Sequence, residues 1–243
     1  MHTISQTRKR ISAALKLIVI LSAAAGTLMS ALAGRNTFMG GSRVLMYFTI
    51  QSNIAIALIC AAGLGFLLRD RPAGRAWYTV KLVGTVSITL TGVVFTFVLA
   101  PTLGKWAWSI QNVLTHVVVP AAAVADFFVT APGAGLRRKS VIWVLLPPLL
   151  YTIYAGIGYV RGWEFARGQN YPYFFLNWGS PAGAFGFSDR LPYMGCVWWI
   201  LTLLLFLLAV AWLSLAVADR IGDHIAGPDA GPDRKAAPRR GQR

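Results

Sequence analysis

Thr49 and His116 are the two residues of this chain whose chemical types, taken together, are able to carry out nucleophilic catalysis. Thr49 begins a polar run inside a long apolar segment, and polar side chains in such segments usually face the interior of a bundle. A threonine hydroxyl attacks an ester carbonyl only after a base takes its proton, and neutral imidazole is the usual base near neutral pH. The pair is therefore able to form a Thr-His dyad for ester cleavage, provided that the two segments meet. The alternative interpretation is structural, because a lone buried histidine is more often a hydrogen-bonded core residue and hydroxyls in membrane spans usually bond backbone carbonyls.

Polar residues near both positions are candidates for lining such a site or for stabilising an oxyanion. If the segment after Thr49 is helical, Thr49, Ser52 and Asn53 share one face. Pro120 lies four residues after His116 and removes the amide that would bond the His116 carbonyl, which predicts a weakened helix there. The candidates that follow from this spacing are Gln51, Ser52, Asn53 and Asn112.

Asp126 is the only acidic residue inside any apolar segment. It lies ten residues after His116, which corresponds to about 15 Å along a helix axis. We therefore do not expect it to be the third member of a catalytic triad.

The composition indicates a membrane protein. The chain has 243 residues, of which 56% are hydrophobic and 13% charged, whereas soluble domains carry about 25% charged residues. We expect an all-α polytopic membrane protein, with one bundle of six transmembrane helices and a helix kink at Pro147-Pro148. The expected spans are residues 11–33, 45–68, 77–100, 106–130, 140–160 and 193–218.

The first apolar segment has two readings. Its basic start and the sequence Ala31-Leu32-Ala33 before Gly34 resemble a signal peptide with a cleavage site. Its apolar part is longer than the roughly 7–15 residues of a signal-peptide core, which favours a retained transmembrane helix.

The net charge of +15 comes mostly from basic residues in the tails and in alternate loops, which favours orientation by the positive-inside rule over nucleic-acid binding. We expect both tails, residues 1–10 and a disordered basic tail at 219–243, to be cytoplasmic. The second and fourth spans then enter from the outer face, so Thr49 and His116 lie in the outer half of the membrane. A multi-pass protein of the bacterial cytoplasmic membrane is expected.

The loop between the last two spans, residues 161–192, is unusually aromatic. Such a loop is expected to lie on the outer mouth of the bundle or in the membrane interface. It serves either as packing and anchoring alone or as a cap over a lipid-binding cavity. The residues proposed for the cap are Tyr171, Pro172, Tyr173, Phe174 and Phe175.

Three motifs together carry a family resemblance. They are Phe48-Thr49 with the following Gln-Ser-Asn run, the sequence from Thr115 to Pro120 with Asp126, and the Tyr171–Phe175 loop. On these motifs the chain resembles a bacterial family of six-span membrane proteins that is similar to the eukaryotic androgen-induced membrane proteins. The latter are threonine hydrolases of fatty acid esters of hydroxy fatty acids. The resemblance implies that Thr49 is the nucleophile, that His116 is the base, and that the substrate is a lipid ester.

Two other classes remain open. A small-molecule or lipid transporter would need charged or carbonyl-lined pathways and often shows internal repeats, whereas the sequence offers Asp126 alone and no repeat. A structural or regulatory membrane protein would need no catalytic group. No cofactor or metal is expected, because the other histidines, His2 and His224, lie in the tails and no paired ligand spacing exists. Membrane lipids are the expected partners, and nucleic acid is not.

Overall fold

A computed structural model of the chain describes residues 5–34, 41–132 and 134–226. Within these residues the elements are all helical, and six helical spans are long and apolar enough to cross a membrane. This confirms the prediction of a six-span all-α membrane protein. The six spans are Gln6–Ala33, Phe48–Leu68, Arg75–Trp106, Ile110–Thr130, Arg138–Val160 and Cys196–Ile225.

Four spans each contain one main α-helix: α1 (Gln6–Ala33), α2 (Phe48–Leu68), α7 (Leu146–Val160) and α8 (Cys196–Ala226). Short 3-10 helices precede α2 and α7, namely η2 (Ser42–Met46) and η6 (Arg138–Leu145), and another, η7 (Phe174–Leu176), lies in the aromatic loop.

The other two spans are each interrupted by a π-helical turn. The third span consists of α3 (Arg75–Val94), the π turn η3 (Phe95–Leu99), α4 (Ala100–Leu103) and η4 (Gly104–Trp106). The fourth consists of α5 (Ile110–Val113), the π turn η5 (Leu114–Val118) and α6 (Val119–Thr130).

Several helix ends differ from the sequence prediction, and proline accounts for one of the differences. The third span continues through Pro101, because this proline stands in the first turn of α4, where its missing amide is not needed. In the fifth span the helix type changes at the place where the sequence predicts a kink: the 3-10 turns of η6 end at Leu145, and α7 begins at Leu146 with Pro147 in its first turn. The last helix extends to Ala226, so residues 219–226 are helical and not disordered as predicted. The remainder of that predicted tail and residues 1–4 lie outside the described residues.

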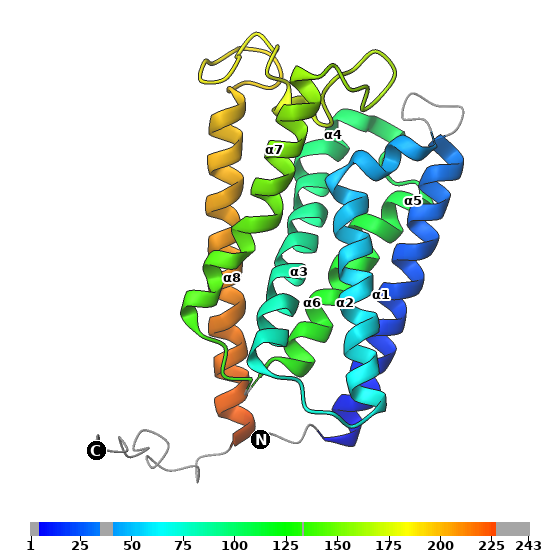
Figure 1. Cartoon of the computed structure of the whole chain (residues 1–243), viewed down its shortest axis with the longest axis vertical. Helices are drawn as coiled ribbons and strands as arrows, with labels where there is room; N and C mark the ends of the chain where they lie inside the picture. Colours follow the sequence, from blue (N-terminus) through cyan, green and yellow to red (C-terminus); the bar gives the residue numbers. More distant parts are fainter. Residues whose placement is uncertain (1–4, 35–40, 133, 227–243) are drawn as a thin grey trace, which may run out of the picture.

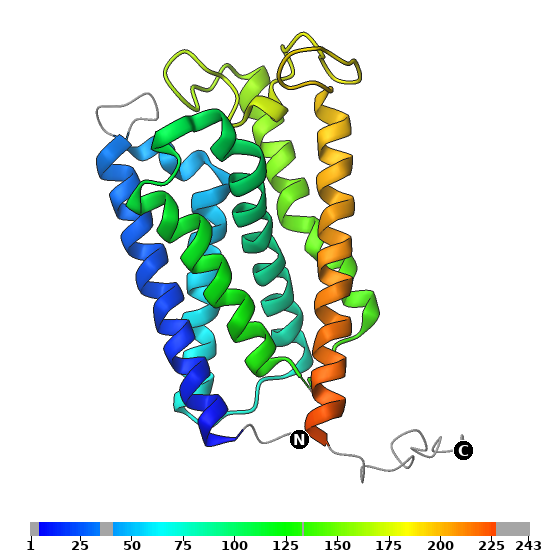
Figure 2. The same cartoon turned by 180° about the vertical axis from the view of Figure 1, so that it is seen from behind.

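The bundle is built around α3. Helix α1 packs against α2 and α6, α3 packs against α2 and α6, and α7 and α8 cover the remaining side of α3 (Figures 1 and 2). The third span, which contains α3, is accordingly the most buried of the six membrane spans. Helix α1 begins and α8 ends at the same end of the bundle, whereas the 161–195 loop lies at the other end, here called the loop end (Figure 1).

A buried ionic cluster joins three of these helices at a distance from the loop end. Both oxygens of Asp126 on α6 lie 2.7 Å from Lys16 Nζ of α1, and its Oδ2 lies 2.6 Å from Lys81 Nζ of α3. Ser12 donates to Oδ1, and Thr130 is a further partner of Lys81. All three charged residues are at most 3% exposed. Asp126 is therefore paired with two lysines, whereas the sequence suggested an isolated acidic residue, and both lysines are buried inside the bundle.

Candidate functional site

Thr49 lies in the first turn of α2, at the loop end, directly beneath the aromatic loop. The phenolic oxygen of Tyr173 accepts a hydrogen bond from the Thr49 backbone N–H at 3.3 Å and lies 3.5 Å from Thr49 Oγ1. The N-cap residue Tyr47 gives no side-chain hydrogen bond to the helix. The Tyr173 hydroxyl thus supplies an acceptor that the first turn of a helix needs.

The chemistry of Tyr173 is set by its surroundings. Burial raises the pKa of its phenol above the ordinary value, against the smaller opposing effect of the hydrogen bonds from Thr49. The side chain is therefore neutral at physiological pH. Because its oxygen already accepts from the Thr49 amide, its own proton remains available to donate.

Ser52 and Asn53, one turn further along α2, connect this helix to its two neighbours. Ser52 Oγ lies 2.8 Å from Thr91 Oγ1 on α3 and donates to the Thr49 carbonyl at 3.0 Å. The side-chain amide of Asn53 donates to the Thr49 carbonyl at 2.8 Å and to the Thr115 carbonyl at 3.2 Å. Asn53 thus links the backbone of Thr49 to the residue that precedes His116.

His116 lies in the π turn η5 and is 8% exposed. Its Nδ1 is 3.0 Å from the Asn112 carbonyl and 3.0 Å from Thr115 Oγ1, which in turn donates to Gln111. A carbonyl oxygen accepts only, so the geometry requires the proton on Nδ1. Nε2 then carries the lone pair, and none of the described residues hydrogen-bonds it. The imidazole is consequently held in the tautomer whose outer nitrogen is able to act as a base.

The backbone of His116 also departs from an ordinary helix, because Pro120 has no amide to bond its carbonyl. Gly92 of α3 packs against this place. A Cβ added to Gly92 would lie 2.8 Å from the His116 carbonyl oxygen and 3.1 Å from Pro120 Cγ. The weakened turn that the sequence predicts is thus a π turn against which α3 packs at a glycine. π turns of this kind often occur at functional sites.

The segments that carry Thr49 and His116 are therefore neighbours, joined through Asn53 and through α3. The hydrogen bonds of these two described residues, however, do not join them to each other. Thr49 Oγ1 is directed to Tyr173, and the imidazole of His116 stacks on Phe95. The predicted dyad is not closed in this structure.

Of the other residues selected from the sequence, some contact Thr49 and some do not. Gln51 is exposed and its amide donates to the Leu45 carbonyl, and the Asn112 amide donates to the Ala107 carbonyl, so neither side chain is directed to Thr49. In the aromatic loop, Tyr173 contacts Thr49. Tyr173 and Phe175 stack with ring centroids 5.1 Å apart. The remaining three loop residues are buried or half-buried.

A small cavity of about 60 Å³ borders Thr49. Its polar lining residues are Thr49, Thr91, Tyr151, Thr152 and Tyr173, and its apolar lining comes from α2, α3, η3, α7, α8 and the loop. Thr91 and Tyr151 were not selected from the sequence. Helical spacing alone does not show which residues of the third and fifth spans meet α2.

No protein-family model, no curated protein and no solved structure matches this chain.

Proposed function

We propose that the protein is an intramembrane hydrolase of lipid esters in which Thr49 is the nucleophile and His116 is the general base. The observation that carries the proposal is the hydrogen bonding of the imidazole. Nδ1 is fixed as a donor by the Asn112 carbonyl, so that Nε2 holds the lone pair that a base needs.

The proposed reaction needs Thr49 Oγ1 and His116 Nε2 to approach to about 3 Å. Catalytic hydrogen bonds are often longer in a protein without substrate and tighten when substrate is bound. Thr49 Oγ1 then attacks the ester carbonyl carbon while its proton passes to Nε2. The tetrahedral intermediate expels the alcohol, which takes that proton. Water, deprotonated by Nε2, hydrolyses the acyl-threonine and releases the acid.

Tyr173 is the group best placed to stabilise the oxyanion. Its neutral phenol keeps a proton for donation, and it lies at the N-terminus of α2, where backbone N–H groups favour negative charge. Asn53 is not available for this role, because its amide nitrogen donates to two backbone carbonyls. Its Oδ1 is buried and has no partner among the described residues, so it offers an acceptor for a water or for the protonated imidazole.

The distribution of basic residues supports one orientation of the bundle in the membrane. The loop joining α2 to α3 and the loop after α6 lie at the end where α1 begins (Figure 1). These loops and the first turns of α3 and η6 that follow them carry Arg69, Arg71, Arg75 and Arg137-Arg138-Lys139. By the positive-inside rule this end is cytoplasmic, which puts the Thr49 site in the outer half of the bacterial cytoplasmic membrane. Reporter fusions after Ala226 and within the 161–195 loop should report the cytoplasm and the outside respectively.

The experiment that tests the function is hydrolysis of fluorogenic fatty acyl esters by the purified protein in detergent. We expect turnover by the wild type, loss of at least a hundredfold in kcat for Thr49→Ala and His116→Ala, and partial retention in Thr49→Ser, which keeps a hydroxyl. Thr89→Ala is the matched control, because Thr89 is a half-buried α3 hydroxyl that bonds only the Thr85 carbonyl. Equal activity in Thr49→Ala and the wild type would contradict the proposal.

A further inference from the structure

The cavity beside Thr49 is too small for a lipid substrate. At about 60 Å³ it has room for a few waters or an ester group, whereas sites for small-molecule ligands usually measure about 300–1,000 Å³. An acyl chain whose ester lay at Thr49 would therefore need a second, larger space that adjoins this cavity.

One large groove meets that condition. It has a volume of about 640 Å³ and lies between α2, α3, η6 and α7. Phe48 and Tyr151 line both this groove and the small cavity of Thr49. Their rings pack edge to face with centroids 5.3 Å apart, so this pair forms the wall that the two spaces share. We call this space the α2–α7 groove.

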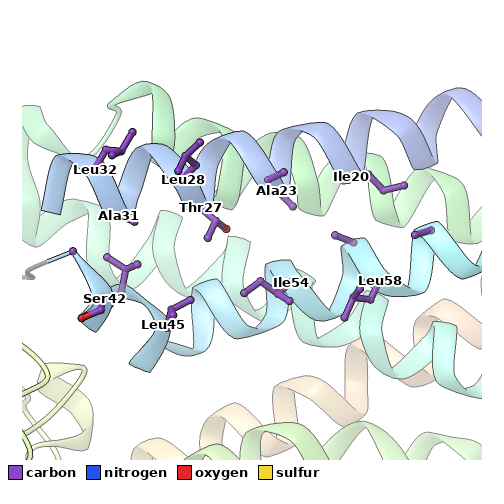
Figure 3. A pocket seen from close by; sticks show the side chains of 15 residues that line it. Ile20, Ala23, Thr27, Leu28, Ala31, Leu32, Ser42, Leu45, Ile54 and Leu58 are labelled. Atoms are coloured by element: carbon purple, nitrogen blue, oxygen red, sulfur yellow. The ribbon is translucent and has the colours of Figure 1, made fainter. Parts of the chain in front are cut away.

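A second groove of similar size provides a comparison. It measures about 580 Å³ and lies between α1 and α2, where Thr27 and Leu28 face Ile54 and Leu58 (Figure 3). None of its lining residues borders the Thr49 cavity. Volume alone does not distinguish the two grooves, but contact with the Thr49 cavity does.

The α2–α7 groove also contains a polar group without a partner. Ser87 lines it and is 5% exposed, and its Oγ makes no hydrogen bond among the described residues. By contrast, Thr89 and Thr91 on the same helix each bond the carbonyl four residues earlier. An unsubstituted acyl chain would leave this hydroxyl unpaired, whereas an acyl chain that carries an oxygen near Ser87 would accept its proton, so the groove favours oxygenated acyl chains.

We infer that the α2–α7 groove holds the acyl chain of a fatty acyl ester whose carbonyl lies at Thr49, with Phe48 and Tyr151 at the junction of the two spaces. The inference rests on the proposed function for the position of the ester. It adds that the substrate enters sideways from the membrane between α2 and α7, and that chain-length selectivity is set by residues of this groove.

The test is photolabelling of the Thr49→Ala protein and of the wild type in detergent, with a fatty acyl ester that carries a diazirine on its chain, followed by peptide mapping. We expect labelling of groove residues on α2 and α7 that an excess of unlabelled ester suppresses. Ala55→Trp, which fills this groove, should reduce labelling at least fivefold. Ala61→Trp, an equally exposed α2 position in the α1–α2 groove, should not.

Competed labelling in the α1–α2 groove would overturn the inference. Labelling that excess ester does not suppress would also overturn it, because such labelling shows only non-specific partition of the probe onto the apolar surface. The readout does not need catalysis. Competed labelling of the α2–α7 groove without hydrolysis by the wild type would support the acyl-chain site and remove the catalytic role of Thr49. Hydrolysis lost in Thr49→Ala together with unchanged labelling in Ala55→Trp would remove the groove and leave the proposed function.

Discussion

The imidazole of His116 stacks on the ring of Phe95 with ring centroids 3.8 Å apart and an interplanar angle of 20°, and each residue lies in a π turn of its own span. A π turn opens the hydrogen-bond ladder and frees backbone groups. Here the stack and the Asn112 carbonyl together fix the plane and the tautomer of the imidazole.

The tautomer of His116 is directly measurable. The chain has three histidines, so ¹⁵N-histidine labelling gives few signals, and His116→Gln assigns the one of interest. We expect Nδ1 to be protonated and Nε2 to show the shift of a nitrogen with a free lone pair at neutral pH. A proton on Nε2 would remove His116 as the base in the resting protein.

The close contact between Gly92 and the His116 backbone predicts that a side chain at position 92 is harmful. In Gly92→Ala the new methyl would lie 2.8 Å from the His116 carbonyl oxygen, and such overpacking typically costs about 1–3 kcal/mol. Thermal unfolding in detergent should show the loss, together with reduced hydrolysis. The control is Gly156→Ala in α7, where nothing lies within 4 Å of the added Cβ, and we expect it to be neutral or slightly stabilising.

The ionic cluster predicts an order of stability among its variants. With both lysines charged the cluster carries one net positive charge. Lys16→Met leaves a balanced Lys81–Asp126 pair, whereas Asp126→Asn leaves two buried cations without a counter-charge. Removing one partner of a buried pair costs about 3–5 kcal/mol. We therefore expect Asp126→Asn to lower the unfolding temperature much more than Lys16→Met. The reverse order would show that the cluster does not work by charge balance.

The role of the Tyr173 hydroxyl in activity can be separated from its role in attaching the loop. Tyr173→Phe removes the hydroxyl at Thr49, while Tyr47→Phe removes a hydroxyl that attaches the same loop through the Phe165 carbonyl at 3.1 Å. Each substitution should cost about 0.5–1.5 kcal/mol of stability. Only Tyr173→Phe should lower kcat, by tenfold or more. Equal effects on kcat would assign Tyr173 to loop attachment alone.

The difference in unfolding free energy between the wild type and Tyr173→Phe should become smaller at high pH. Burial raises the pKa of Tyr173 in the folded protein above the ordinary value of 10.0, so the folded state holds this proton more tightly than the unfolded state. The contribution is complete below pH 10 and declines as the pH rises through the folded-state pKa. Unfolding measurements from pH 8 to 11 should show a constant difference up to about pH 10 and a smaller one above it.

The number and positions of the spans were predictable because each span is a long apolar run between charged loops. The details that failed depend on context. Pro101 looked like a helix end, but it stands in the first turn of a new helical segment. Pro147-Pro148 was expected to interrupt the fifth span, and the 3-10 turns of η6 change to α7 at this place. Asp126 looked isolated because its lysines are 110 and 45 residues away in the chain. Their depth in the bundle is set by packing, which the sequence does not show.

The candidate site was predictable only in part. Sequence spacing placed Ser52 and Asn53 on the face of Thr49, and both side chains bond the Thr49 carbonyl. The same spacing did not exclude Gln51 and Asn112, whose amides bond nearby backbone carbonyls instead. The contacts of Thr49 with Tyr173 and of His116 with Phe95 join residues far apart in the chain, so they required the structure. The Thr49–His116 dyad stays a prediction.

The most direct test of the central claim is covalent labelling of the purified protein with a fluorophosphonate probe, followed by mass mapping of the modified residue. We expect a single modification on Thr49 that disappears in Thr49→Ala and in His116→Ala, while Thr89→Ala is labelled like the wild type. Labelling that persists in Thr49→Ala, or that maps to another residue, would contradict the claim that Thr49 is an activated nucleophile.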